Sequence, residues 1–205
     1  MGVVALGAAV GTAVVEFARV WRRGSAPLPA ETDDIVGAAG TATLEAIAVV
    51  REGYRVTSTR ENAVFNLLAA FTVTFGLTRG TTAIIRSGRG GRLLRDMVIA
   101  DRRVHHFVPG IVLALAAGAT SISIRREHLD RWLALPFGAG SALILDEAAL
   151  LLELEDVYWT EEGVLSLQVS FGAISLLAAI ALGVRLLRRG ESSVGITPAP
   201  APRSP

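Results

Sequence analysis

Five apolar stretches, each long enough to cross a lipid bilayer as a helix, constrain this chain to a membrane architecture. They cover residues 3–20, 61–85, 104–124, 132–152 and 164–184. A helix rises about 1.5 Å per residue, so roughly 20 apolar residues cross the ~30 Å hydrocarbon core. Trp21, Trp132 and Trp159 fall at predicted span ends, where aromatic side chains favour the membrane interface. The sequence therefore predicts an all-α, polytopic transmembrane helix bundle of about five spans.

The composition agrees with membrane insertion and excludes several chemistries. Of the 205 residues 51% are hydrophobic, and the net charge of +1 gives no basic field for a nucleic-acid partner. The absence of cysteine excludes thiolate nucleophiles, iron–sulfur clusters and disulfides. All 20 basic residues are arginine, which removes a P-loop lysine and a Schiff-base lysine. We expect one transmembrane domain over 1–189 and a disordered, proline-rich tail over 190–205.

Two segments near the N-terminus leave alternatives open. Val3–Val20 is predicted to be the first span, and a signal peptide is its alternative, although no positive region precedes the apolar stretch. Asp33–Val50 predicts a shorter helix that lies at the interface or packs on the bundle, because it carries Glu45. Asp33 and Asp34 lie near the start of this helix, where negative charge suits the helix dipole.

Basic segments predict an orientation. Placing 22–60, 125–131 and the tail in the cytoplasm follows the positive-inside tendency, but it leaves the basic loop 86–103 outside. Apolar residues within 93–99 predict a surface helix that holds anionic headgroups, and a solvated loop is the alternative. Arg79 is expected to extend to the headgroups. We expect a multi-pass protein of the cell membrane, with membrane lipids as partners and a homo-oligomer as the assembly that would form a pore.

The spans 104–124 and 132–152 must form an antiparallel hairpin, because the connector 125–131 is short. With His128 at the midpoint of the turn, Gly110 lies opposite Asp146 and Gly118 lies opposite Gly138. Small residues then recur at every fourth position on both helices. Such stripes allow membrane helices to approach closely.

Ionisable residues gather at one end of this hairpin, at one predicted membrane depth. They are His105 and His106 at the start of the first helix, and Asp146, Glu147, Glu153 and Asp156 near the end of the second. Helical side chains tilt toward the N-terminus, which directs Asp146 inward and His106 outward and disfavours their contact. Glu153 is therefore the expected partner of the histidines. Such groups are costly in a membrane, so they predict a functional site.

The chemistry considered for this site is a divalent metal with nitrogen and oxygen ligands. The candidate ligands are His105, His106, Glu153 and Asp156, and the candidate catalytic bases are Asp146 and Glu147. Pro109 inside the helix would leave the His105 carbonyl free as a further ligand. The alternatives are histidines bonded to headgroups and carboxylates that tie helices together.

Three motifs carry a family resemblance. His-His-Phe-Val-Pro-Gly at 105–110, Leu-Asp-Glu-Ala at 145–148 and Glu-Asp-Val-Tyr-Trp at 155–159 resemble an uncharacterised family of bacterial integral membrane proteins. The resemblance extends from about Arg60 to Trp159. It implies a multi-pass fold and carries no mechanism.

Three classes of function follow from these residues. The first is a membrane-embedded, metal-dependent enzyme that acts on a lipid or another amphiphile. The second is a proton- or ion-coupled transporter or channel subunit, in which Asp146 and Glu147 titrate and Arg79 shapes selectivity. The third is a structural membrane protein whose polar residues fix helix packing.

Overall fold

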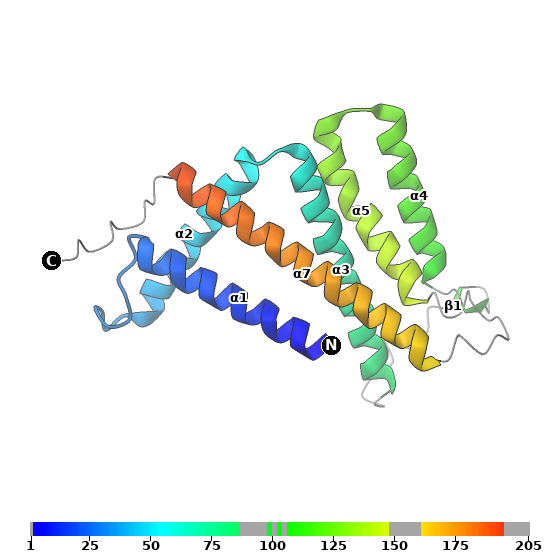
Figure 1. The fold of residues 1–205 in the computed structure, drawn as a ribbon, viewed down its shortest axis with the longest axis horizontal. Coiled ribbons are helices and arrows are strands. Elements are labelled where there is room, and N and C mark those ends of the chain that lie inside the picture. The colour runs from blue at the N-terminus through cyan, green and yellow to red at the C-terminus, as the bar shows by residue number, and fades with distance from the viewer. Residues whose placement is uncertain (1, 87–97, 100–101, 104–105, 148–160, 195–205) are drawn as a thin grey trace. The chain divides into compact units, whose positions relative to one another are not determined.

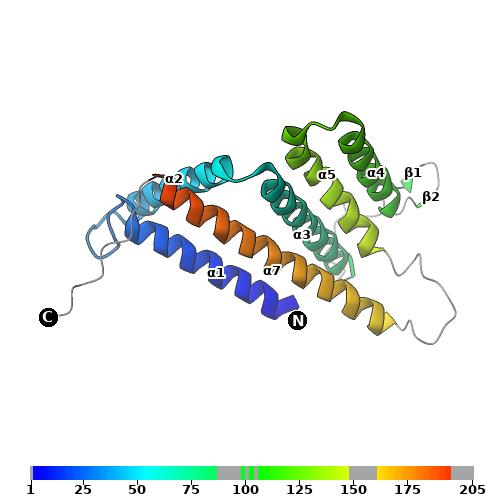
Figure 2. The same ribbon diagram turned by 45° about the horizontal axis from the view of Figure 1, so that its top comes forward.

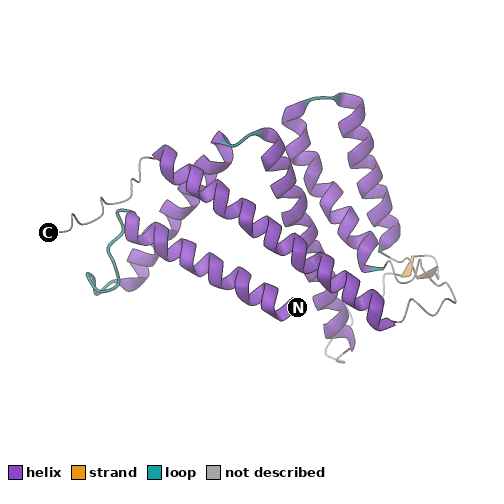
Figure 3. Ribbon diagram, in the orientation of Figure 1, coloured by secondary structure: helices purple, strands orange, loops and turns teal. Residues whose placement is uncertain are grey.

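The computed structural model describes residues 2–86, 98–99, 102–103, 106–147 and 161–194 (Figure 1). These residues form six helices and one pair of short strands, which Figure 3 colours by type. The helices are α1 (Gly2–Arg23), α2 (Ile35–Val56), α3 (Thr59–Arg86), α4 (Phe107–Ile124), α5 (Glu127–Asp146) and α7 (Glu161–Val194). The strands β1 (Val98–Ile99) and β2 (Arg102–Arg103) pair antiparallel, so residues 98–99 do not continue the predicted surface helix. The helical class is confirmed.

Four helices are long and apolar enough to cross a membrane. The crossing segments are Val4–Arg23, Thr59–Thr82, Phe107–Ile124 and Val169–Val194, and each overlaps a predicted span. The fifth predicted span, 132–152, overlaps α5, which carries Glu127 and Asp130 in its first turn and is not among these four helices. Residues 148–152 of that predicted span lie outside the described residues. α7 continues to Val194, into the segment predicted as a tail.

The predicted short helix corresponds to α2. Its first residue is Ile35, and the Asp34 side chain accepts the Gly37 N–H at 2.9 Å. This is an N-cap, which satisfies one of the N–H groups that a helix start leaves without a partner. The position of the acidic residues at the start of this helix is therefore confirmed.

Large apolar side chains cover the outside of the candidate spans. Val73, Leu115 and Ile174 are each at least 60% exposed. Extended apolar surface is unusual on a soluble monomer, and it is ordinary where lipid replaces water. The surface and the four apolar helices are consistent with a membrane protein, as predicted.

The chain divides into two compact units. Unit 1 contains Met1–Leu6 and Thr59–Ala179, and unit 2 contains Gly7–Ser58 and Ile180–Pro205.

In unit 1, large residues of α3 pack against small residues of α5. Phe71 and Phe75 stack on α3 with ring centroids 5.8 Å apart, and they form a buried core with Ala142 of α5. Four residues before Ala142, Gly138 lies against the backbone of Leu67, where a Cβ atom would collide with the Leu67 carbonyl. The missing side chain of Gly138 therefore sets how closely the two helices approach.

The predicted hairpin of α4 and α5 is confirmed, and its turn is shorter than expected (Figure 2). Because α5 begins at Glu127, the turn contains only residues 125 and 126, and His128 lies inside the helix. Arg125 ends α4 in the left-handed conformation, with φ 46°, and donates its N–H to the Ser121 carbonyl at 3.2 Å. One such residue is enough to reverse the chain between the two helices.

The shorter turn changes the predicted register. Gly110 packs against Gly140, and Gly138 faces α3 and not α4. The predictions that placed Gly110 opposite Asp146 and Gly118 opposite Gly138 are therefore wrong, by about one helical turn.

In unit 2, α1 and α7 run parallel and are joined by ion pairs whose carboxylates are buried. Arg188 of α7 lies 3.2 Å from Glu16, and Glu191 lies 2.9 Å from Arg19, farther along both helices. Arg19 also pairs with Glu16 within α1 at 2.6 Å. Both carboxylates are buried, so their charges are compensated by arginines and not by water.

The remaining helix of unit 2, α2, crosses α7 at a pair of glycines. A Cβ atom on Gly53 would collide with the Leu186 carbonyl, and one on Gly190 would collide with the Val49 carbonyl. The two backbones therefore touch at this crossing. Arg189 of α7 also lies 3.4 Å from the Thr57 hydroxyl, directly after α2.

Replacing Gly138 with alanine tests the close approach of α3 and α5. The added Cβ would force the helices apart, so we expect a loss of roughly 1–3 kcal/mol of stability, as in an overpacked core. Gly76→Ala is the matched control, because a Cβ at Gly76 meets no atom within 4 Å and alanine favours a helix more than glycine. Thermal unfolding in detergent measures both, and equal melting temperatures would contradict this packing.

Candidate functional site

Four polar residues meet where α3, α4 and α5 come together in unit 1. Arg79 lies on α3, His106 is the N-cap of α4, Asp146 ends α5 and Glu147 follows it. We call these four residues the helix-end cluster. α5 runs antiparallel to α4 and parallel to α3, as the pairs Asn66–Arg131 and Arg79–Asp146 show, so the end of α5 meets the start of α4.

Asp146 is the most buried member of the cluster, with a side chain only 6% exposed. Its Oδ1 lies 2.6 Å from Nε of Arg79, an ion pair by distance whose direction is not that of a hydrogen bond. The Arg79 guanidinium also donates to the Asp146 backbone carbonyl at 3.3 Å. Oδ2 lies 3.0 Å from Nε2 of His106. A buried carboxylate needs such partners, because burial removes the water that would otherwise solvate its charge.

Glu147 links the end of α5 to the start of α4. Its Oε2 accepts the backbone N–H of Phe107 at 2.9 Å, and its Oε1 lies 3.1 Å from Nδ1 of His106. Negative charge at the C-terminus of α5 is disfavoured by the dipole of that helix. The N-terminus of α4 offsets this cost, because its N–H groups and dipole favour an anion.

His106 lies between the two carboxylates. A neutral imidazole has one N–H and donates to one acceptor, whereas the doubly protonated ring donates from both nitrogens. Both ring nitrogens of His106 face a carboxylate oxygen, at 3.0 Å and 3.1 Å. The ring is 37% exposed, whereas the side chains of Asp146 and Glu147 are only 6% and 12% exposed.

The contact between His106 and Asp146 corrects the sequence prediction that disfavoured it, and Glu153, the predicted partner of the histidines, lies outside the described residues. His106 precedes the first residue of α4, so the tilt of side chains inside a helix does not direct it. Pro109 lies in the first turn of α4, where its missing N–H is one that no helical carbonyl would accept, and His105, whose carbonyl was predicted to be free, lies outside the described residues.

Three of the predicted metal ligands, His105, Glu153 and Asp156, lie outside the described residues. Within the described part, no group of three or more histidine and carboxylate residues is arranged to hold a metal ion. The two nitrogens of His106 point away from each other toward different carboxylates, so one ion could not use both pairs. The described residues of the cluster therefore do not fit a metal centre.

Arg79 is the member whose role the sequence analysis missed. Its guanidinium lies 5.5 Å from the centre of the Phe75 ring and against Asp146, two contacts that the sequence analysis did not predict. The sequence contained a signal for this contact. When a hairpin follows another span, the first and third helices run parallel. Arg79 near the end of the first and Asp146 near the end of the third therefore reach the same membrane depth.

Comparisons with known proteins find no matching family model, curated protein or solved structure. The resemblance to a bacterial membrane protein family stays a prediction.

Removing either partner of the Arg79–Asp146 pair should have unequal effects. Arg79→Met leaves a carboxylate in a nearly buried position, and we expect a loss of about 3 kcal/mol, typical of a broken buried pair. Asp146→Asn keeps the shape and leaves the charge on the more exposed guanidinium, so we expect a loss nearer to ~1 kcal/mol.

A double-mutant cycle on unfolding in detergent measures the coupling of this pair, which we expect to be about 1–3 kcal/mol. Arg60→Met with Glu127→Gln is the control cycle, since that pair is 4.0 Å apart and almost fully exposed. Additive effects at residues 79 and 146 would contradict the pairing.

Proposed function

We propose that this chain is an integral membrane protein that crosses the bilayer five times. Support comes from the directions of its helices. α1 and α7 run parallel, since Glu16 pairs with Arg188 and Arg19 pairs with Glu191. Two parallel spans require an odd number of crossings between them. α3, α4 and α5 supply three, whereas α3 and α4 alone would make α7 antiparallel to α1.

The third of these crossings, α5, follows α4 from end to end. Ser121 donates to Asp130 at 2.8 Å near the turn, and His106 contacts Asp146 at the other end. A helix paired along the whole length of a span covers the same membrane depth. The polar first residues of α5 then lie at the interface, beside the end of α4.

This topology collects arginines on one face. They are Arg22 and Arg23 at the end of α1, Arg125 and Arg126 in the hairpin turn, and Arg185, Arg188 and Arg189 near the end of α7. The positive-inside tendency then makes this face cytoplasmic in a cell membrane. The helix-end cluster lies at the ends of α4 and α5 that are far from the hairpin turn, and therefore near the other face of the membrane.

Cysteine labelling tests the topology cleanly, because the native chain has no cysteine. We expect Asp33→Cys, Arg126→Cys and Ser193→Cys to react with an impermeant maleimide from one side of the membrane, and Val108→Cys from the other. All four side chains are exposed. If position 193 reacts from the side opposite to position 33, the chain crosses an odd number of times after α1, where the proposal requires four crossings, and the proposal is wrong.

We further propose that the helix-end cluster takes up and releases a proton, and that the protein is a proton-coupled transporter or channel subunit. The observation that carries this proposal is the position of His106, an accessible imidazole between two shielded carboxylates. Gain or loss of one proton there changes two ion pairs at the junction of α4 and α5. Ionisable groups at membrane depth mark proton and ion pathways more often than they serve packing alone.

The two other functions are less well supported. A metal-dependent enzyme would need ligands that converge, which the described cluster does not offer. A purely structural role would be served by the buried pair of Arg79 and Asp146, without a histidine open to solvent. The proton proposal accounts for both the shielded and the accessible members of the cluster.

Proton flux into liposomes tests this proposal. Under an imposed membrane potential, we expect the reconstituted protein to acidify the liposome interior, which an entrapped pH dye reports. We expect His106→Gln to reduce the initial rate of proton flux at least tenfold, because glutamine cannot carry the proton. His128→Gln is the matched control, because it removes the same side chain from an exposed position in the first turn of α5. A wild-type rate equal to that of empty liposomes, or an unchanged rate in H106Q, would overturn the proposal.

A further inference from the structure

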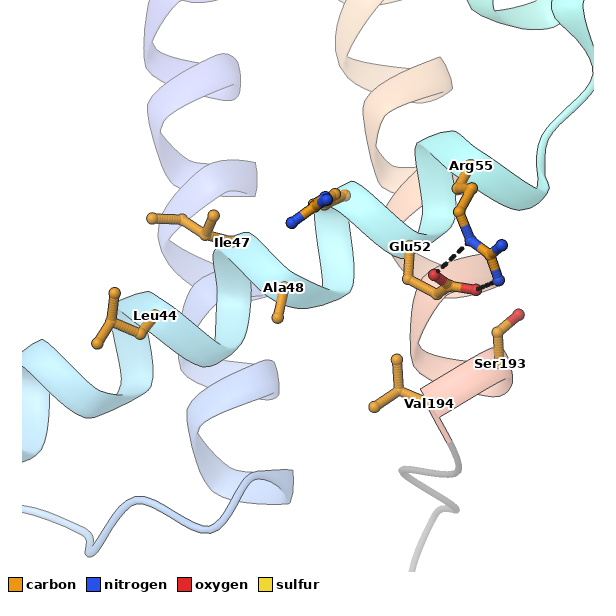
Figure 4. A pocket seen from close by; sticks show the side chains of 8 residues that line it. Leu44, Ile47, Ala48, Glu52, Arg55, Ser193 and Val194 are labelled. Atoms are coloured by element: carbon orange, nitrogen blue, oxygen red, sulfur yellow. Dashed lines mark hydrogen bonds and ion pairs between the residues drawn. The ribbon is translucent and has the colours of Figure 1, made fainter.

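A hollow of 550 Å³ lies in unit 2, between the exposed side of α2 and the end of α7 (Figure 4). Its apolar wall comes from Leu44 and Ile47 of α2 and from Val194 of α7. Its polar rim comes from α2 one to three turns later, where Arg51, Glu52 and Arg55 line it. Along α2, apolar side chains and then charged side chains therefore line the same cavity.

The charges at the rim are not equivalent. Arg55 holds Glu52 through two hydrogen bonds, from Nε at 2.9 Å and from a terminal nitrogen at 3.0 Å, which Figure 4 shows as dashed lines. The bonds from Arg55 lower the pKa of the Glu52 carboxyl below its usual range, so this residue is ionised at neutral pH. Arg51 is exposed and has no hydrogen bond or ion pair to any other described residue. The rim carries a net charge of +1, on a guanidinium with donors to spare.

The helix that carries the rim has the pattern of an interfacial helix. Leu44, Ile47 and Arg51 follow one another at spacings of three and four, so they share one face of α2. Leu44 and Ile47 are largely exposed, and α2 is not among the apolar helices that could cross a membrane. A helix with an apolar face and flanking arginines lies in the headgroup region of a bilayer.

α2 is also fixed in place within unit 2. Glu45 accepts hydrogen bonds from the backbone N–H and the hydroxyl of Ser25, after α1, and the glycine crossing joins α2 to α7. The hollow is therefore lined by residues of two helices that contact each other at the glycine crossing.

We propose that this hollow binds the headgroup of an anionic phospholipid, with its phosphate on Arg51 and its acyl chain along Leu44 and Ile47. A guanidinium matches the geometry of a phosphate and binds it through paired N–H donors. An apolar wall next to that donor suits an amphiphile and not a free ion. The inference rests on the proposed membrane insertion and is independent of the proton site.

Lipid titration of the purified full-length protein tests the proposal. Short-chain phosphatidylglycerol should bind and raise the melting temperature in detergent, and phosphatidylcholine with the same chains should not. We expect Arg51→Gln to weaken binding about tenfold, equivalent to ~1.4 kcal/mol. Glu52→Gln should strengthen it, because Arg55 is then released to the phosphate. Added salt should weaken binding in the wild type.

Arg60→Gln is the matched control, since it removes one exposed arginine from unit 1. Equal effects of R51Q and R60Q would mean that diffuse charge and not this hollow attracts the lipid, and weaker binding in E52Q would contradict the role of Arg55. Inorganic phosphate that competes as well as the lipid would identify a free ion as the ligand and overturn the lipid assignment. Cysteine labelling separates this failure from failure of membrane insertion, because it requires no lipid ligand.

Discussion

The close approach of α3 to α5 is the constraint on which unit 1 depends. Three positions of α5 at spacing four, Gly138, Ala142 and Asp146, face a stripe at the same spacing on α3, which consists of Leu67, Phe71, Phe75 and Arg79. The aromatic rings of α3 pack against the small side chains of α5. Close packing, and not burial of apolar surface, therefore stabilises this pair of helices. This suits a membrane, where lipid chains are as apolar as the protein and give helices little hydrophobic reason to associate. The same approach brings the arginine within reach of the aspartate at the end of the stripe.

The helix-end cluster is consistent with the energetics of charge in an apolar medium. Two carboxylates at the C-terminus of α5 would be unfavourable on that helix alone. They are stabilised by Arg79 of α3 and by the start of α4, which supplies the Phe107 N–H and the His106 ring, so the partners come from two other helices. If one of these helices moved away, a charged residue on another helix would lose its partner. The cluster therefore couples the positions of three helices, which is the property that a proton-driven conformational change would require.

The sequence predicted the elements of this fold better than their pairing. Apolar length identified four candidate spans, and Asp34 marked the start of α2, because these signals are local. The hairpin register depended on the length of a turn, which Arg125 shortened by entering the left-handed conformation, a state that an arginine adopts rarely. The shift reassigned the partner of Gly138 and brought Asp146 to His106. The role of Arg79 depended on a third helix, because its partner Asp146 belongs to α5, and the sequence analysis did not pair α3 with that helix.

The ion pairs between α1 and α7 have a consequence for the order in which the molecule is built. Arg19 and Glu191 are 172 positions apart in sequence, so unit 2 cannot close until α7 has been synthesised. Until then, the charged residues of α1 have no partners on α7. The pair that Glu16 and Arg19 form within α1 at 2.6 Å provides for this, because each neutralises the other before any second helix arrives. The ion pair within α1 thus forms first and later becomes part of the interface with α7. The last helix, α7, completes unit 2.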